Sequence, residues 1–189
     1  MKRWGSDRVQ EKILNRLERK EKQQAFKRDR FFKFKVTEIH NKLFQALLMK
    51  KVIETENPAA ISDALLKGLK KLLNISEFDL RYFIAPIRDL VPRPNPYSLY
   101  MTQYIMETLI DDQNVIEIYG TDKDIYQAVN EIFSQASVRF EKAEEEAISE
   151  LARNKSLLPG SREYEIALDQ LFRRKVGEPQ DSKRTPHLK

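Results

Sequence analysis

The sequence predicts an all-α protein made of two tandem helical hairpins, one long helix and a protruding basic N-terminal helix. Its 189 residues are 41% hydrophobic and 33% charged, with 5 Gly and 8 Pro, which is the usual balance of a soluble helical chain. Apolar residues recur every three or four positions through most of the chain. No Gly or Pro occurs between Ser6 and Asn57, so nothing there is a strong helix breaker.

Residues 1–35 are predicted to form a basic amphipathic arm. Ser6 suits the N-cap of a helix, and a narrow apolar stripe with a four-residue repeat follows it, formed by Val9, Ile13 and Leu17 with Leu14 beside them. So narrow a stripe on a polar helix is typical of a docking helix. Residues 31–36 alternate with a period of two instead, which fits either a short extended joint or an uninterrupted helix.

The first helical-hairpin unit, with its connector, spans residues 36–96. Thr37 can cap a new helix, residues 52–55 are short and β-prone, and Asn57-Pro58 is a turn signal. Two further helices are expected, the first with Ile61, Leu65, Leu69 and Leu72 on one face and the second with Phe78, Leu80, Tyr82, Phe83 and Ile84. The three prolines of residues 92–96 suit a stiff connector.

The second unit spans residues 97–176, and residues 177–189 form a polar tail that we expect to be disordered. Ser98 can cap its first helix, and Thr121 or Asp122 can cap a long helix. The apolar positions of that helix are nearly heptad-spaced: Val129, Phe133, Ala136, Phe140, Ala143, Ala147 and Leu151. Pro159-Gly160 breaks the chain, and Ser161 caps a last amphipathic helix.

The two units look like copies of one building block. Residues 37–72 and residues 98–133 each contain an amphipathic helix, a Val-Ile-Glu tripeptide, a turn and a second amphipathic helix. Each hairpin has one apolar face that it cannot bury alone, so the two are expected to pack together. The tripeptides, which begin at Val52 and Val115, can then pair as a tiny two-stranded ribbon across a pseudo-dyad.

Charge is distributed unevenly along the chain. Residues 1–35 carry 13 basic and 5 acidic side chains, whereas residues 97–151 carry 3 basic and 12 acidic ones. The basic arm also contains interleaved aromatic residues, and its candidate partner- or nucleic-acid-binding set is Arg16, Arg19, Lys20, Lys27, Arg28, Arg30, Phe31, Phe32, Lys33, Phe34 and Lys35. Composition leaves three partners open: RNA, an anionic membrane surface, and a protein groove that accepts the apolar stripe.

The sequence offers little catalytic chemistry. It has no Cys, no Gly-rich phosphate loop and two isolated histidines, of which His40 reads as structural and His187 lies in the tail. A carboxylate metal site at Asp111, Asp112, Asp122 and Asp124 is conceivable, although helix-end and capping roles explain these residues more simply. Residues 144–146, all Glu, read as a solvated face. We therefore predict no catalytic, cofactor or metal residues, and no small-molecule substrate is evident.

One C-terminal motif carries a family resemblance. Residues 160–164, Gly-Ser-Arg-Glu-Tyr, together with the duplicated unit, resemble the bacterial domain of unknown function family 507. The family pattern has Trp where this chain has Tyr164, and tyrosines where it has Leu171 and Phe172. The resemblance covers residues 36–176 and implies a bacterial, cytoplasmic setting, but it assigns no activity.

These observations favour a non-enzymatic interaction or adaptor protein in the cytoplasm. Its helical faces are expected to dock a protein partner or a second copy, and the basic arm to add electrostatic attachment. The alternative is an RNA- or ribosome-binding protein that acts through the basic aromatic arm, for which affinity should fall as salt rises.

Overall fold

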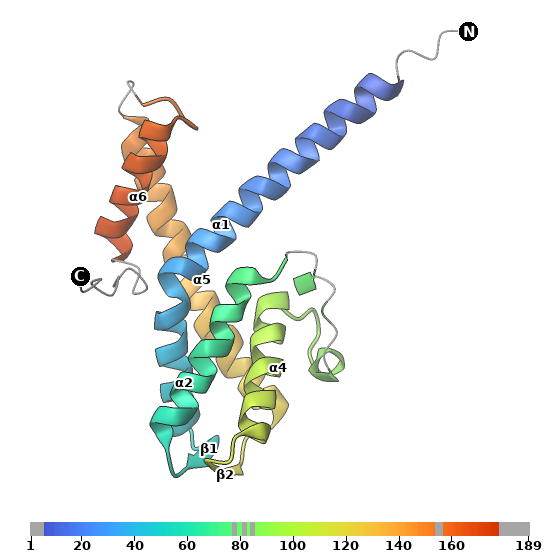
Figure 1. Cartoon of the computed structure of the whole chain (residues 1–189), viewed down its shortest axis with the longest axis vertical. Coiled ribbons are helices and arrows are strands. Elements are labelled where there is room, and N and C mark those ends of the chain that lie inside the picture. The colour runs from blue at the N-terminus through green and yellow to red at the C-terminus, as the bar shows by residue number, and fades with distance from the viewer. Residues whose placement is uncertain (1–5, 77–78, 81–82, 84–85, 154–156, 178–189) are drawn as a thin grey trace, which may run out of the picture.

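The computed structural model describes residues 6–76, 79–80, 83, 86–153 and 157–177. This part is mostly helical, which confirms the predicted all-α class (Figure 1). The helices and strands are α1 (Ser6–Met49), β1 (Ile53–Thr55), α2 (Pro58–Leu69), α4 (Pro96–Asp111), β2 (Val115–Ile118), α5 (Asp122–Ala152) and α6 (Arg162–Val176), with 3-10 turns at Lys70–Asn74 and Pro86–Leu90. Most of the helix predicted to carry Phe78 and Tyr82 lies outside the described residues. No helix within the described ranges is both long and apolar enough to cross a membrane.

The N-terminal helix α1 is one uninterrupted helix of 44 residues, about 66 Å long at 1.5 Å per residue. Residues 31–36, for which the sequence allowed either an extended joint or an uninterrupted helix, are therefore helical. The prediction that Thr37 caps a new helix is wrong. The apparent period of two arises because α1 is covered on several sides here. Phe31 packs on α5, Phe32 on α4 and α5, and Phe34 on α6.

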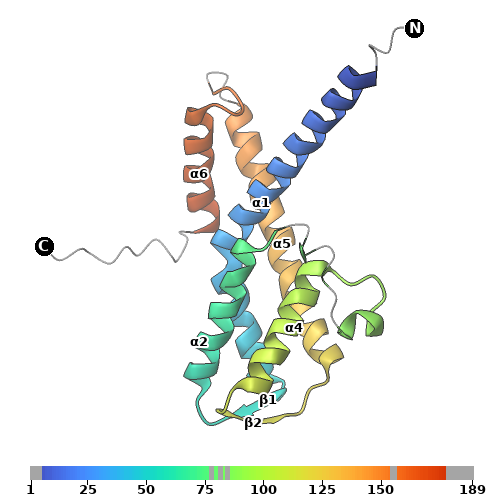
Figure 2. The same cartoon turned by 45° about the vertical axis from the view of Figure 1, so that its right-hand side comes forward.

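Four helical segments form the main bundle (Figure 2). The C-terminal half of α1 contacts α2, α2 contacts α4, α4 contacts α5, and α5 contacts α1. Each segment contributes side chains less than 3% exposed to the shared core, among them Ile39, Leu43, Leu47, Ile61, Leu65, Ile105, Leu109, Ile125 and Val129. The packing of two amphipathic hairpins therefore buries the apolar faces that the sequence marked.

Strands β1 and β2 pair antiparallel at the closed end of the bundle, which confirms the predicted ribbon. Ile53 pairs with Ile118 and Glu54 with Glu117, and the register shifts at Thr55. The Glu54–Glu117 pair joins residues 63 positions apart, which is the offset that superposes the two Val-Ile-Glu tripeptides. The pair thus lies where the pseudo-dyad was expected, while duplication of the whole units stays a prediction.

The second half of α5 extends beyond the bundle and pairs with α6 in a separate hairpin (Figure 1). Two predicted caps hold its helices. Thr121 forms a capping box with Asp124, and the Ser161 hydroxyl accepts the Tyr164 amide at 3.1 Å. Gly160 has φ +85°, the left-handed conformation that favours glycine. At α4, however, Asn95 is the cap instead of Ser98, because Pro96 already occupies the first helical turn.

Candidate interaction surface

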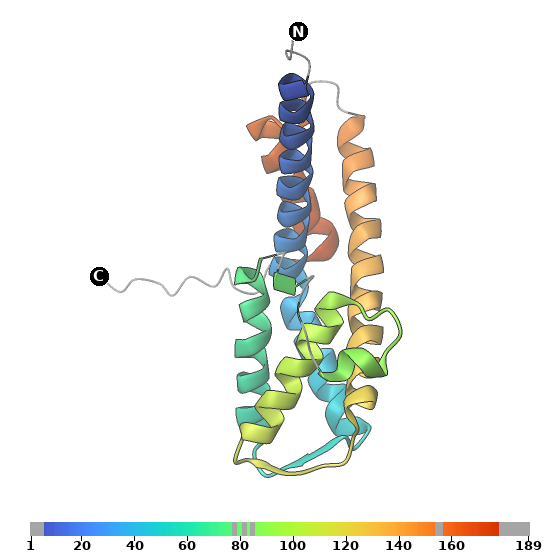
Figure 3. The same cartoon turned by 90° about the vertical axis from the view of Figure 1, so that its right-hand side faces the viewer.

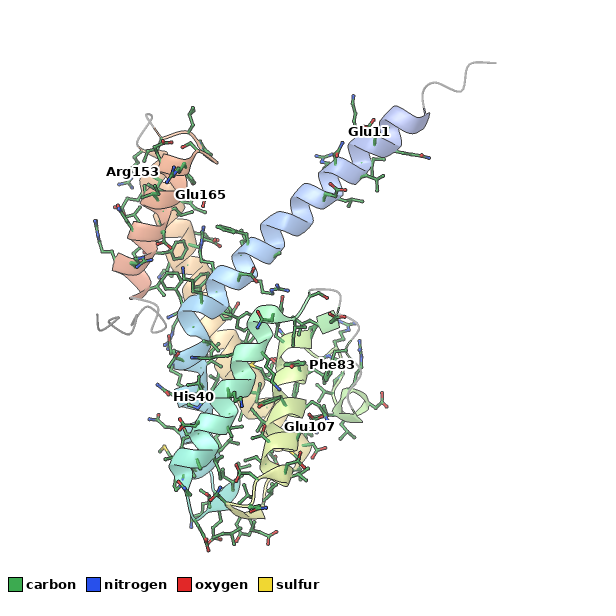
Figure 4. All side chains as sticks on the ribbon, in the orientation of Figure 1. Glu11, His40, Phe83, Glu107, Arg153 and Glu165 are labelled. Atoms are coloured by element: carbon green, nitrogen blue, oxygen red, sulfur yellow. The ribbon has the colours of Figure 1, made fainter. Side chains whose placement is uncertain are left out.

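The first half of α1 projects from the molecule as a free arm (Figures 1 and 2). All four apolar side chains of its stripe are exposed: Val9 by 56%, Ile13 by 52%, Leu14 by 59% and Leu17 by 50%. Figure 4 shows the side chains around Glu11 standing in open space, away from the other elements. The predicted protruding helix is therefore present, and its docking stripe has no intramolecular partner among the described residues.

The arm is shorter than the predicted 35 residues, because two of its candidate aromatic residues belong to the core. Phe31 is 8% exposed and Phe32 1%. Phe31 makes edge-to-face contacts with Phe133 and Phe140 of α5, with ring centroids 5.4 and 5.3 Å apart. These two rings are not available to stack on unpaired bases, so the prediction that they form an open binding platform is wrong.

Arg30 is likewise a structural residue instead of a free cation. Its guanidinium lies 3.7 Å from Glu144 of α5 and 3.3 Å from Glu165 of α6, and its side chain is only 9% exposed. It also stacks over the rings of Phe26 and Phe172. Arg30 thus ties α1 to both helices of the second hairpin.

The expectation that Glu144 belongs to a solvated face is wrong. Its residue exposure is 7%, and Lys27 Nζ lies 3.6 Å from its carboxylate in addition to Arg30. The physical reason is that α1 lies across α5 at this point and supplies two cations that offset the cost of burying the carboxylate. The neighbouring residues behave as predicted, since Glu145 and Glu146 are exposed.

Lys35 is engaged in a local charge cluster. Its Nζ donates to Glu38 at 2.6 Å, and Lys42 Nζ donates to the other carboxylate oxygen at 2.7 Å. Partial burial acts to raise the pKa of Glu38, but these two hydrogen bonds and the lysine charges outweigh it and lower the pKa to about 2. Lys35 therefore holds α1 locally and is 12% exposed.

The remaining members of the predicted set differ in availability. Arg16, Lys27 and Lys33 are exposed, Arg28 is paired with Asp29 at 2.9 Å, and Phe34 is half-buried against Phe172. The side chains of Arg19 and Lys20 lie outside the described part of the chain. The structure thus brings Lys27, Arg28, Phe31 and Phe32 to one place and leaves Arg16 on the free arm.

That place is a groove between α1 and α5, which we call the α1–α5 groove. In Figure 3, the upper part of α1 is blue, α5 is orange, and α4 lies lower in the view in yellow-green. The groove has a volume of about 540 Å³ and is open to solvent. Its floor is aromatic and its α5 wall is acidic, with lining residues Lys27, Arg28, Phe31, Phe32, Tyr97, Phe133, Ser137, Phe140, Glu141, Glu144, Glu145 and Ile148. Sequence reasoning missed it, because the groove exists only where two distant helices diverge.

A second groove lies on the other side of α1, against α6. It has a volume of about 660 Å³, and its lining mixes both signs of charge: Phe26, Asp29, Arg30, Lys33, Phe34, Arg162, Glu165, Ile166, Asp169, Gln170 and Arg173. Several of these groups already pair with each other, as Arg30 does with Glu165 and Arg173 with Asp169. We therefore consider the α1–α5 groove the stronger candidate binding surface of the two.

Two of the four carboxylates considered for a metal site, Asp112 and Asp124, have structural roles. Asp112 accepts the backbone amide of Asn114, and Asp124 completes the capping box with Thr121, so its pKa is lowered by those hydrogen bonds. Within the described ranges, no three His, Cys, Asp or Glu side chains cluster closely enough to hold a metal ion. His40 is buried between α1 and α2 and contacts the Ser62 carbonyl oxygen at 2.8 Å (Figure 4).

Comparison with known proteins gives a family match to one part of this chain. The model of the protein family of unknown function DUF507 matches residues 97–177, which comprise α4, β2, α5 and α6. The match begins after the connector, so the predicted extent from residue 36 is wider than the matched segment. Neither the curated proteins nor the solved structures searched gave a match. Over residues 97–177, the chain is therefore similar to the DUF507 family, the family that its sequence resembles.

Proposed function

We propose that this protein is a non-enzymatic interaction protein that binds a protein partner through the free arm of α1 in the bacterial cytoplasm. The observation that carries the proposal is the apolar stripe of Val9, Ile13 and Leu17, held at least half exposed on a helix that projects from the body. Such a stripe is what a helix-in-groove interaction uses, with anchors at intervals of about one turn.

The energetics indicate what kind of partner is needed. Full burial of one such side chain contributes about 1.5–3 kcal/mol, and about half of that is still available at 50% exposure. Four side chains therefore offer roughly 3–6 kcal/mol, which lies at the low end of the estimated cost of association, about 4–15 kcal/mol. The stripe needs a partner that adds contacts elsewhere, and the cations Lys12 and Arg16 beside it favour an acidic one.

A capture experiment on the full-length chain tests the proposal. The stripe variant carries Val9→Ser, Ile13→Ser and Leu17→Ser, and the matched control carries Gln10→Ser and Asn15→Ser, which are exposed polar positions on the same helix. Point variants are preferred to deletion of residues 1–35, because that deletion would remove the core residues Phe31 and Phe32. Circular dichroism checks that helicity is kept.

We expect the stripe variant to lose protein capture from bacterial lysate, the control to keep it, and nuclease treatment to leave it unchanged. Equal capture by the stripe variant would refute the proposal. Capture that disappears with nuclease and weakens steeply with salt would instead favour the RNA-binding alternative.

A further inference from the structure

We infer that the partner of the arm is a second copy of this chain, and that two copies exchange arms so that each stripe lies in the other's α1–α5 groove. This inference rests on the proposed function and names its partner. It follows from three features of the described residues: the chemistry of the groove, the spacing of the charges, and the geometry that keeps an arm out of its own groove.

The groove has the chemical character that complements the arm. Its exposed apolar surface comes from Ile148, which is 39% exposed, while the rings of Phe31, Phe133 and Phe140 are largely buried at its floor. Its α5 wall presents the exposed carboxylates of Glu141 and Glu145. In the part of the chain that the structure describes, Glu145 makes no hydrogen bond or ion pair, and Glu141 accepts only the Ser137 hydroxyl at 3.3 Å.

The charges on the two surfaces have the same spacing. Lys12 and Arg16 are four residues apart on α1, and Glu141 and Glu145 are four residues apart on α5. Each pair therefore spans about 6 Å along its helix axis, so one arm can bring both cations to both carboxylates. The α1–α6 groove also has two carboxylates four residues apart, Glu165 and Asp169, but these already pair with Arg30 and Arg173. Lys27 and Arg28 line the α1–α5 groove, where Lys27 pairs with Glu144 and Arg28 with Asp29.

An arm cannot fill the groove of its own chain. Ile13 and Phe31 lie on one continuous helix, 18 residues and about 27 Å apart. Eighteen residues are five helical turns, so Ile13 faces the same side as Phe31 and continues the groove surface outward along the arm. The stripe is thus directed towards the open side of the groove while being held away from its floor, and the geometry leaves that floor to a helix from another molecule.

Exchange of arms also supplies the free energy of association that burial of a single stripe does not provide. A two-fold arrangement uses the same pair of surfaces twice, so the apolar burial and the charge pairs double while the loss of translational freedom is incurred once. Stable interfaces bury about 1,200–2,000 Å² in total, and two arm-in-groove contacts reach that range more readily than one.

Charge reversal followed by sedimentation velocity and light scattering tests the exchange. We expect the full-length chain to have twice the chain mass of 22.3 kDa at micromolar concentration. Glu141→Lys with Glu145→Lys should weaken dimerisation by at least about tenfold, and adding Lys12→Glu with Arg16→Glu should restore it. The matched control, Glu107→Lys with Glu131→Lys, changes two exposed acidic residues outside the groove and should leave the dimer intact.

The absence of native Cys makes a direct contact test clean. If the arm runs antiparallel to α5, so that Lys12 faces Glu145 and Arg16 faces Glu141, Val9 lies opposite Ile148. Chains carrying Val9→Cys are mixed with chains carrying Ile148→Cys, which lines the groove, or Val138→Cys, which is 65% exposed on the same helix and does not line it. Under mild oxidation we expect the mixed disulfide with Ile148→Cys and not with Val138→Cys.

A monomer at all concentrations, a dimer insensitive to the charge reversal, or equal disulfide yields would overturn the exchange. If the chain is monomeric and its stripe variant still loses protein capture, the exchange is wrong while the proposed interaction function stands. If the stripe variant captures protein as the wild type does, the proposed function itself fails.

Discussion

Replacing Gly68 by Ala should destabilise the protein, although helix propensity alone predicts the reverse. Gly68 is buried in α2 where that helix crosses α4. A Cβ atom at this position would lie 1.5 Å from Cζ of the Tyr104 ring. Ordinary carbon contacts are about 3.5–4.0 Å, so the ring must withdraw by about 2 Å. Tyr104 also donates its hydroxyl to the Ala64 carbonyl oxygen at 3.3 Å, a bond that the withdrawal breaks.

The expected change in the free energy of unfolding for Gly68→Ala is the sum of opposing effects. Ala is favoured over Gly in a helix interior by about 0.8–1 kcal/mol. Overpacking costs about 1–3 kcal/mol, and the lost hydrogen bond about 0.5–1.5 kcal/mol. The net change in the free energy of unfolding is a loss of about 1–3 kcal/mol, which corresponds to roughly 2–10 °C in Tm for a chain of this length.

Urea unfolding followed by circular dichroism measures this change in wild type, Gly68→Ala, Tyr104→Ala and the double variant. Once Tyr104 is truncated, the clash is gone, and Gly68→Ala should then stabilise by up to about 1 kcal/mol. The critical result is that Gly68→Ala destabilises the protein when Tyr104 is present and stabilises it when Tyr104 is truncated. Stabilisation by Gly68→Ala in the wild-type background would refute the reasoning about how closely α2 and α4 approach.

Three further predictions concern charged residues. Glu144→Gln removes one of the two carboxylates that neutralise buried Arg30, so urea unfolding should show a loss of about 1–3 kcal/mol; no loss would mean that the pair adds nothing. Lys51 has φ +52°, so Lys51→Gly should stabilise by about 0.5–1 kcal/mol in the same assay, unlike Lys50→Gly at the preceding residue. The pKa of Glu38 is lowered from 4.5 to about 2, so its contribution to stability is present above pH 4.5 and is lost as the pH falls towards 2. Glu38→Gln should therefore flatten the acid limb of a stability–pH profile, and an unchanged limb would contradict this.

Much of the local structure was readable from the sequence. The caps at Thr121 and Ser161 were predictable because a hydroxyl placed just before an amphipathic run satisfies the free amides of the first turn. The β-ribbon was predictable from the repeated Val-Ile-Glu tripeptides, and the buried faces of α2, α5 and α6 from their apolar spacing. The resemblance to the DUF507 family was predicted from residues 160–164 together with the duplicated unit, and the family match over residues 97–177 supports that family.

The candidate site was less predictable from the sequence, because the type of a side chain does not say which face of its helix is covered by another helix. Phe31 and Phe32 have the composition of a base-stacking platform, yet they are core residues, since α5 and α4 approach α1 there. Glu144 belongs to a run of three acidic residues but is buried beside Arg30. Neither the burial of Phe31 and Phe32 nor the burial of Glu144 is determined by residues nearby in the sequence.

The sequence by itself determined the helical class, the helix ends with the strongest caps, the ribbon and the exposed stripe of the arm. Those features depend on contacts within a few residues or on periodicity along one element. Only the tertiary structure decided where the arm leaves the body, which basic residues stay available and where the α1–α5 groove lies. These depend on the angle at which α1 crosses α5, and that angle is set by packing between residues about a hundred positions apart.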